Sequence, residues 1–308
     1  MKFDRCLNSL TASPQLIPVR LGPMRSLERQ QSRDRLRHSS LPNMTEWDAA
    51  EYSRRSSLQE AMAQEVLALL DLKGSERILD VGCGDGKITA QIAARASKGS
   101  VVGVDPSRDM ISFARSHFGP ATLPNLRFEV ADARRLPFKN EFDLVVSFNA
   151  LHWIPEQQTA LSSIRSTLVS GGKAQLRLVS KGARKSVENV TEETRRTSRW
   201  KAYFQDFEDP YLHLTPEEYA ALAERSGFRV LHVSTKDHSW DFGFRTAFSG
   251  FCAVGCVAWT SRLPATERMN FINDVLDRYQ DVAGDHSGEE NTFKFYQMDI
   301  SLLAISEK

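Results

Sequence analysis

Three aspartates follow three short apolar segments in the first half of the chain. Asp80 follows RIL and precedes the turn GCGDG, Asp105 ends SVVGVD, and Asp132 follows LRFEVA. If these segments are parallel strands, their carboxyl ends meet at one edge of a sheet, and such sheets bind ligands beyond that edge. The sequence therefore predicts that the three carboxylates gather around one ligand.

The glycine-rich turn narrows the chemistry of that ligand. Gly82 and Gly84 let the backbone approach a ligand without a Cβ clash, which suits NAD, FAD or a nucleoside. Asp105 is placed to accept both hydroxyls of a ribose in any of these. Two details favour a nucleoside without a pyrophosphate. Asp80 would repel a diphosphate but suits an ammonium group, and Asp132 is placed to accept the N6 hydrogens of adenine.

A fourth apolar segment, FDLVVSF, leads into NALHWIPEQ and brings Asn149, His152 and Trp153 to the same predicted edge. A tryptophan in a connection more often packs than reacts, although its indole N–H is a hydrogen-bond donor. His152 either holds the loop through backbone hydrogen bonds or acts as a base. Both interpretations stay open at this point.

The elements that must position these residues alternate regularly up to about residue 180. Strands separated by helices at this spacing predict an α/β fold with a parallel, doubly wound sheet. Gly171 and Gly172 are predicted to end the third of these helices. The predicted strands are RILDV, SVVGVD, LRFEVAD, FDLVVSFNA and KAQLRLVS, and the helices between them begin at Lys87, after the N-cap Ser107, and at Pro155.

The regular alternation breaks after Ser180. Residues 181–214 are polar and aromatic by turns, and they form a predicted helical lid insertion of the same domain. A helix capped by Thr215 and the strand FRVLHVSTKD follow. Helical stretches at about 245–259 and 265–282 precede a last strand, FYQMDISLLAIS.

Composition excludes several classes of function. Of 308 residues, 41% are hydrophobic and 26% charged, and the net charge is +1, so nucleic acid and anionic membranes are not expected partners. No apolar run approaches the roughly 20 residues of a membrane span. Four scattered cysteines favour a reducing compartment. Cys252 and Cys256 lack a nearby histidine that could complete a metal site, so we expect them to be buried and expect no metal.

Residues 1–43 differ from the rest because they are rich in Arg, Ser and Pro and have few acidic residues. A disordered extension, a transit peptide for a mitochondrion or plastid, and an over-extended start are the three interpretations. The globular pattern begins at Met44, so 44–308 is predicted to be a single domain. Without a functional transit peptide, we expect a cytoplasmic protein.

Five motifs in order, ILDVGCGDG, VVGVDPSRDM, VADARRLPF, FDLVVSFNALHWI and LVSGGK, resemble those of class I S-adenosylmethionine-dependent methyltransferases. The resemblance covers about residues 75–180. It implies a Rossmann-like seven-stranded sheet in the order 3-2-1-4-5-7-6 with an antiparallel strand seven, and S-adenosyl-L-methionine as cofactor. The cofactor contacts that it implies are Asp80, Gly82, Gly84, Asp105, Pro106, Met110, Asp132, Ala133 and Asn149.

A narrower resemblance covers AAEYSRRSSLQ, LHWI, RWKAYF and FINDVLDRY. These segments are similar to juvenile hormone acid methyltransferases and trans-aconitate methyltransferases. The resemblance implies O-methylation of a small carboxylic acid whose carboxylate is held by Gln59 and Trp153. A carboxylate is already ionised at neutral pH and needs orientation more than a base.

Two alternatives remain. In one, the enzyme methylates an oxygen, nitrogen or carbon of another small metabolite, and His152 is the catalytic base. In the other, the chain is a non-catalytic cofactor-binding partner subunit. A nucleic-acid methyltransferase is disfavoured because no Asn/Asp-Pro-Pro-Tyr follows the fourth strand and no dense basic face is present. The sequence does not indicate an oligomeric state.

Overall fold

The computed structural model describes residues 62, 65–283 and 288–305. All of them belong to one compact unit that spans Asn43–Lys308. The predictions for residues 1–43 and for Gln59 lie outside the described residues.

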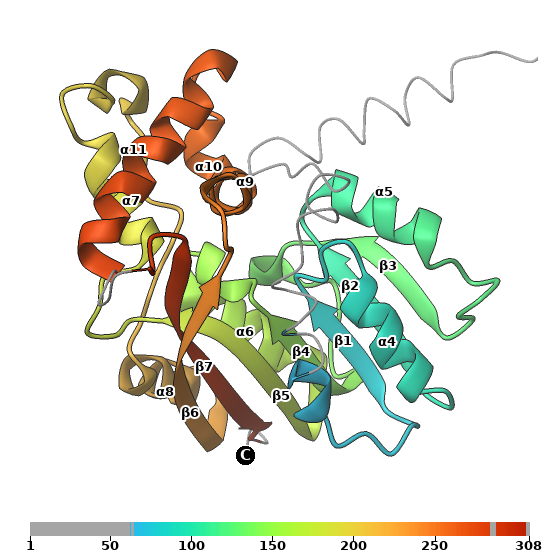
Figure 1. Ribbon diagram of the computed structural model, residues 1–308. Helices are drawn as coiled ribbons and strands as arrows, with labels where there is room; N and C mark the ends of the chain where they lie inside the picture. Colours follow the sequence, from blue (N-terminus) through green and yellow to red (C-terminus); the bar gives the residue numbers. More distant parts are fainter. Residues whose placement is uncertain (1–61, 63–64, 284–287, 306–308) are drawn as a thin grey trace, which may run out of the picture. The chain divides into compact units, whose positions relative to one another are not determined.

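A seven-stranded sheet in the order β3-β2-β1-β4-β5-β7-β6 organises this unit (Figure 1). Neighbouring strands from β3 to β5 run parallel, whereas β7 is antiparallel to both β5 and β6. The predicted strand order and the antiparallel seventh strand are confirmed. The strands are β1 (Arg77–Val81), β2 (Ser100–Asp105), β3 (Leu126–Val130), β4 (Phe142–Phe148), β5 (Leu168–Ser180), β6 (Phe228–Asp241) and β7 (Thr292–Ala304).

Helices cover both faces of the sheet. One apolar core joins the sheet to α6 and α8, and another joins it to α4 and α5. Because both faces are covered, β1 and β2 are almost continuously apolar and buried, as expected for parallel strands. These helices are α4 (Lys87–Arg95), α5 (Arg108–His117), α6 (Gln157–Thr167) and α8 (Pro216–Arg225).

A second group of helices, called the upper helices below, lies above the β5, β7 and β6 end of the sheet (Figure 1). They surround a core of their own, to which the start of β7 also contributes Phe293 and Phe295. Further along the same strand, Met298 and Ile300 belong to the sheet core. The elements are α7 (Val187–Arg195) and the short helix η3 (Lys201–Phe204) in the insertion 181–214, then α9 (Arg245–Gly255), α10 (Val257–Thr260) and α11 (Ala265–Ala283).

The prediction for the segment around α6 was wrong at both ends. The helix begins at Gln157 rather than at Pro155, and it ends at Thr167, because β5 already starts at the fully buried Leu168. Gly171 lies inside that strand with φ 73° and does not cap a helix. The pairing of β4 with β5 shifts register here, and a glycine is well suited to such a bulge.

Both predicted N-caps are confirmed. The Ser107 hydroxyl accepts the Met110 N–H at 3.3 Å, and Thr215 forms a capping box with Glu218. The first of these caps fixes the start of α5 directly after β2, at the edge where the ligand is expected.

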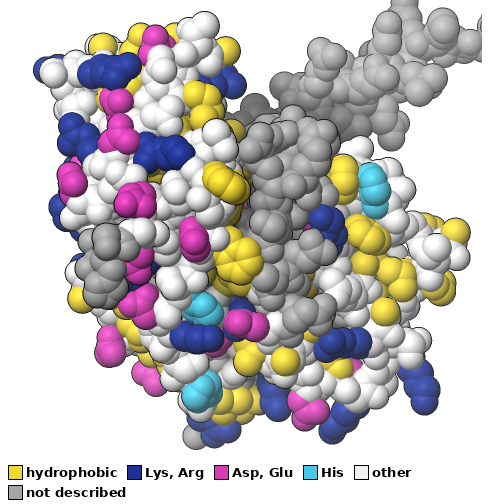
Figure 2. Space-filling model, viewed as in Figure 1, with side chains coloured by type: hydrophobic (Ala, Val, Ile, Leu, Met, Phe, Trp, Pro, Cys, Tyr) yellow, Lys and Arg dark blue, Asp and Glu magenta, His cyan; other side chains and the backbone are white. Residues whose placement is uncertain are grey.

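Charged side chains of both signs are interspersed over much of the face shown in Figure 2. This distribution agrees with the net charge of +1. Within the described ranges, no helix is long and apolar enough to cross a membrane.

Candidate functional site

The glycine turn after β1 has a backbone that other residues adopt only with strain. Gly82 and Gly84 have φ of 78° and 53°. A Cβ on Gly82 would lie 2.2 Å from the Cβ of Ala150, so the turn packs directly against the loop after β4. A Cβ on Gly84 would meet no described heavy atom within 4 Å. The turn therefore presents bare backbone on that side, where a ligand can approach closely.

Asp105 is held by the backbone on two sides. Its Oδ2 accepts the Gly84 N–H at 3.0 Å, and its Oδ1 accepts the Ser107 N–H at 2.9 Å. Pro106 lies between Asp105 and this cap residue, at the bend into α5. Carboxylate oxygens can accept more than one hydrogen bond each, so the oriented carboxylate suits a ribose diol.

Asp80 is almost completely buried and accepts a hydrogen bond from the Thr89 hydroxyl at 2.6 Å. Burial raises the pKa of Asp80 to about 7; the Thr89 hydrogen bond opposes this shift and the negative charge of Asp105 adds to it. Near neutral pH the carboxyl is therefore partly protonated, and a nearby cation would favour its charged form. The structure thus brings Asp80 and Asp105 together around the glycine turn, as predicted.

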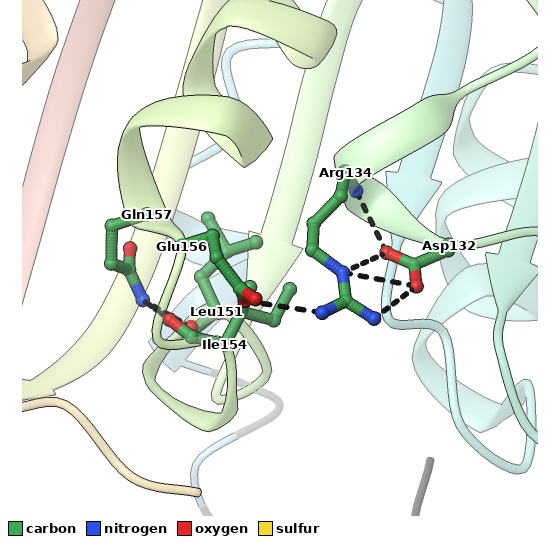
Figure 3. Close-up of polar contacts among 6 residues, drawn as sticks. All are labelled: Asp132, Arg134, Leu151, Ile154, Glu156 and Gln157. Atoms are coloured by element: carbon green, nitrogen blue, oxygen red, sulfur yellow. Dashed lines mark hydrogen bonds and ion pairs between the residues drawn. The ribbon is translucent and has the colours of Figure 1, made fainter. Parts of the chain in front are cut away.

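Asp132 has a partner that the sequence analysis missed. Arg134 contacts both of its carboxylate oxygens, at 2.7 Å for the ion pair, and reaches Glu156 at 3.1 Å (Figure 3). Burial alone would raise the pKa of Asp132, but hydrogen bonds and the charge of Arg134 hold it below its usual value. Asp132 remains an ionised acceptor, and any adenine contact would share it with Arg134. Arg134, two positions after Asp132 in the sequence, was the signal that could have predicted this pairing.

The other predicted cofactor contacts lie on the connections after β2, β3 and β4. Met110 on α5 and Ala133 in the short helix η1 (Ala133–Arg135) are buried, so their side chains can offer only apolar surface. Asn149 directly follows β4 and has φ 55°, and its N–H donates to the Arg177 carbonyl at 2.8 Å. A positive φ is uncommon outside glycine, although asparagine tolerates it better than most residues.

His152 is buried in the short helix η2 (Leu151–Trp153), and its position limits its chemistry. Its Nδ1 lies 3.2 Å from the backbone nitrogen of Val179 and accepts that N–H. In the neutral ring the proton therefore sits on Nε2. Burial, helped by the nearby His213, keeps the pKa of His152 well below its usual value. His152 is thus a neutral donor whose basic nitrogen is already engaged.

Trp153 is half-buried and packs against rings from two distant segments. Its ring meets Tyr211 edge-on at 4.7 Å between centroids and Trp259 at 6.2 Å. Tyr211 also lies 4.9 Å from the ring of His152. Sequence analysis did not identify Tyr211, although it belongs to the acidic and aromatic stretch of the insertion.

Gln157 fixes the shape of the loop that carries these two residues. Its Nε2 donates to the carbonyls of Leu151 and Ile154, the latter at 2.8 Å (Figure 3). From the other side, the Leu212 N–H donates to the His152 carbonyl at 3.0 Å. The insertion and the loop after β4 are therefore joined by the backbone as well as by aromatic contacts.

No cluster of three or more His, Cys, Asp or Glu side chains that could hold a metal ion occurs in the part of the chain that the structure describes. Cys252 and Cys256 are buried in the core of the upper helices, as predicted.

Sequence comparison adds named relatives. A family model described as a methyltransferase domain matches residues 78–172. A protein of Invertebrate iridescent virus 6, provisionally designated methyltransferase 235L, is 28% identical over 76% of this chain and 85% of its own length. Juvenile hormone acid O-methyltransferase of Drosophila melanogaster is 30% identical over 66% of this chain and 71% of its own length. A trans-aconitate 2-methyltransferase of Deinococcus radiodurans is 35% identical, but the match covers only 41% of this chain and 46% of that protein.

Solved structures share the fold. Phosphoethanolamine N-methyltransferase 2 of Haemonchus contortus, solved with S-adenosyl-L-methionine, matches with a TM-score of 0.55 at 17% identity, over 84% of this chain and 57% of that one. The [4+2]-cyclase SpnF matches with a TM-score of 0.52 at 19% identity, over 80% of this chain and 81% of that one. At such identities the likeness concerns architecture alone.

Proposed function

The chain belongs to the class I S-adenosylmethionine-dependent methyltransferases, and we propose that its methyl acceptor is the carboxylate of a small organic acid. The names of two relatives, one acting on juvenile hormone acid and one on trans-aconitate, point to this acceptor class. The observation that carries the proposal is the state of His152, whose basic nitrogen accepts the Val179 N–H.

An acceptor that must lose a proton would need a base at this place. His152 can serve only if its Nδ1 gives up the Val179 hydrogen bond or its proton changes nitrogen, and burial opposes the charged ring that would result. A carboxylate needs no base because its pKa lies near 4, far below neutral pH. Neutral donors around it are sufficient, and they orient the anion without neutralising it as an arginine would.

Trp153 is the neutral donor that we assign to the proposed acceptor site. Its ring is held edge-on by Tyr211, so the direction of the indole N–H is fixed before an acceptor arrives. Gln59, the other residue that the family resemblance suggests, lies outside the described residues. In this proposal Trp153 orients the anion, and His152 supports the loop through its contact with β5.

The residues at this edge of the sheet fit the cofactor. Asp105 would hold the ribose hydroxyls, Asp80 the ammonium group, and Asp132 the adenine amine, while Met110 and Ala133 would supply apolar contacts. When bound, the cofactor supplies a methyl group on a positively charged sulfur, and no proton is released when a carboxylate takes it. The protein therefore has to bind, align and exclude water, and the aromatic insertion suits the last of these tasks.

The direct test is transfer of labelled methyl from the cofactor to a panel of fatty, isoprenoid and polycarboxylic acids. The expected product is a methyl ester, which releases its label in mild base. Matched alcohols of the same carbon skeletons serve as controls and should remain unlabelled. Labelled alcohols with unlabelled acids would overturn the proposal and favour a base-assisted reaction.

A further inference from the structure

A cavity of about 230 Å³ lies where the end of β5, the start of α7 and the start of β7 meet. Thirteen described residues line it, and none of them is Asp or Glu. Four carry a positive charge: Lys181, Arg184, Lys185 and Lys294. A pocket with this lining is electrostatically suited to an anion.

The carboxylates that pair with three of these cations stand outside the lining. Arg184 pairs with Asp237 at 2.5 Å, Lys185 pairs with Glu193 at 2.7 Å, and the buried Lys294 pairs with Glu289 at 2.7 Å. Asp237 and Glu193 are about half exposed, and ion pairs of such groups contribute little and rearrange easily. The exposed side chain of Lys181 forms no ion pair within the described part of the chain.

His213 is a second, independent indication that a ligand binds here, because one of its ring nitrogens lacks a hydrogen-bond partner in the described part of the chain. His213 is one of the residues that line the cavity, and its Nε2 is buried and has no hydrogen-bond partner among the described residues. Burial lowers the pKa of His213 to about 3, so the ring is neutral at ordinary pH. A buried ring nitrogen without a partner costs free energy, and a ligand oxygen facing its N–H would remove that cost.

The loop that carries Lys181, Arg184 and Lys185 packs closely against β7. A Cβ on Gly182 would lie 2.1 Å from the ring of Tyr296, so the backbone of the loop lies directly against this ring. The guanidinium of Arg184 stands 4.9 Å from the centroid of the same ring. The cations are thus presented by a loop that is packed in place before any ligand arrives.

We propose that this cavity binds an oxyanion, either a carboxylate or a phosphate group, through Lys181, Arg184 and the Nε2–H of His213. The group can belong to a free inorganic anion or to a second acidic group of the methyl acceptor. Both sources present the same chemistry to the pocket, and an experiment can separate them.

Calorimetric titration of the full-length protein with inorganic phosphate tests the site without methyl transfer. Lys181→Glu and His213→Phe are each expected to weaken phosphate binding about fivefold to tenfold, since they reverse one contacting charge or remove one donor. Lys173→Glu is the matched control, because Lys173 is an exposed lysine on β5, the strand that leads into Lys181, but lies outside the cavity. It should leave binding unchanged.

Absence of phosphate binding to the unaltered protein, or equal weakening by all three variants, would overturn the proposal. The source of the anion then follows from acceptor kinetics. If the acceptor supplies the group, phosphate raises the KM of dicarboxylic acceptors but not that of monocarboxylic ones. If a free anion is the ligand, phosphate affects both classes alike. Failure of the carboxylate proposal itself would leave the phosphate titration intact, so the two can be judged separately.

Discussion

The Nδ1 atom of His152 accepts the backbone N–H of Val179 at 3.2 Å, which joins the loop after β4 to the neighbouring strand β5. This one hydrogen bond decides the protonation of the ring. It turns a residue that the sequence offers as a base into one that can only donate from its other nitrogen.

The pH dependence of kcat should therefore show no ionisation of His152. At saturating cofactor and acid, kcat is expected to stay flat from about pH 6 to about pH 8, since the pKa of this ring lies well below the usual histidine range. His152→Asn, whose side chain can still accept the Val179 N–H, should keep kcat within about tenfold. A kcat that rises with a histidine-like pKa and is lost in the variant would contradict this assignment.

Trp153→Phe separates packing from hydrogen bonding at the proposed acceptor site. Phenylalanine keeps an aromatic contact with Tyr211 but has no N–H, so kcat/KM for the acid should fall about 10²-fold while cofactor affinity hardly changes. Trp240→Phe, at another half-buried tryptophan, is the control and should leave turnover unaltered. Loss of cofactor binding in Trp153→Phe, measured by calorimetry, would contradict the assigned role.

Cofactor affinity should depend on pH through Asp80. With a pKa of about 7 in the unliganded protein, this carboxyl is mostly protonated at about pH 6 and mostly charged at about pH 7.5. A cationic ligand favours the charged form, so affinity should rise several-fold over this window and binding near pH 7 should release protons. Calorimetry in buffers of different ionisation enthalpy measures that release. Asp80→Asn should bind more weakly but with no dependence on pH in this range.

The close packing of Gly82 against Ala150 predicts that Gly82→Ala lowers stability and that a second substitution at Ala150 restores part of the loss. An alanine at either Gly82 or Gly84 must adopt a positive φ, which costs about 1–2 kcal/mol. Gly82→Ala should lose more, because its methyl group would also collide with Ala150. Adding Ala150→Gly should restore part of the lost unfolding free energy in the Gly82 variant and none in the Gly84 variant. Denaturant unfolding measures each value, and equal losses in both single variants would contradict this account.

Much of the fold could be predicted because the signals are local. The short apolar strands, the glycine turn and the cap at Ser107 each fit a few consecutive residues, and the alternation of strands with helices leaves few topologies. The end of α6 could not be read in this way. Gly171 looks like a helix stop, and only the pairing of β4 with β5 shows that it lies within a strand.

The site was predictable where backbone geometry dictates it and less so where side chains meet across the fold. Asp80 and Asp105 follow from the position of the strand ends. The pairing of Asp132 with Arg134 is local, but its competition with ligand hydrogen bonds depends on three-dimensional geometry. The packing of Tyr211 on Trp153 and the hydrogen bond from Val179 involve segments that only tertiary structure brings together.

Strand β7 contributes to two cores, with Phe293 and Phe295 in that of the upper helices and Met298 and Ile300 in that of the sheet. A continuous strand cannot lose its pairing at one end without loosening the contacts beside it. The two layers should therefore unfold as one cooperative unit along this strand. In hydrogen exchange, its amide protons should form a single slow class that crosses the boundary between the cores.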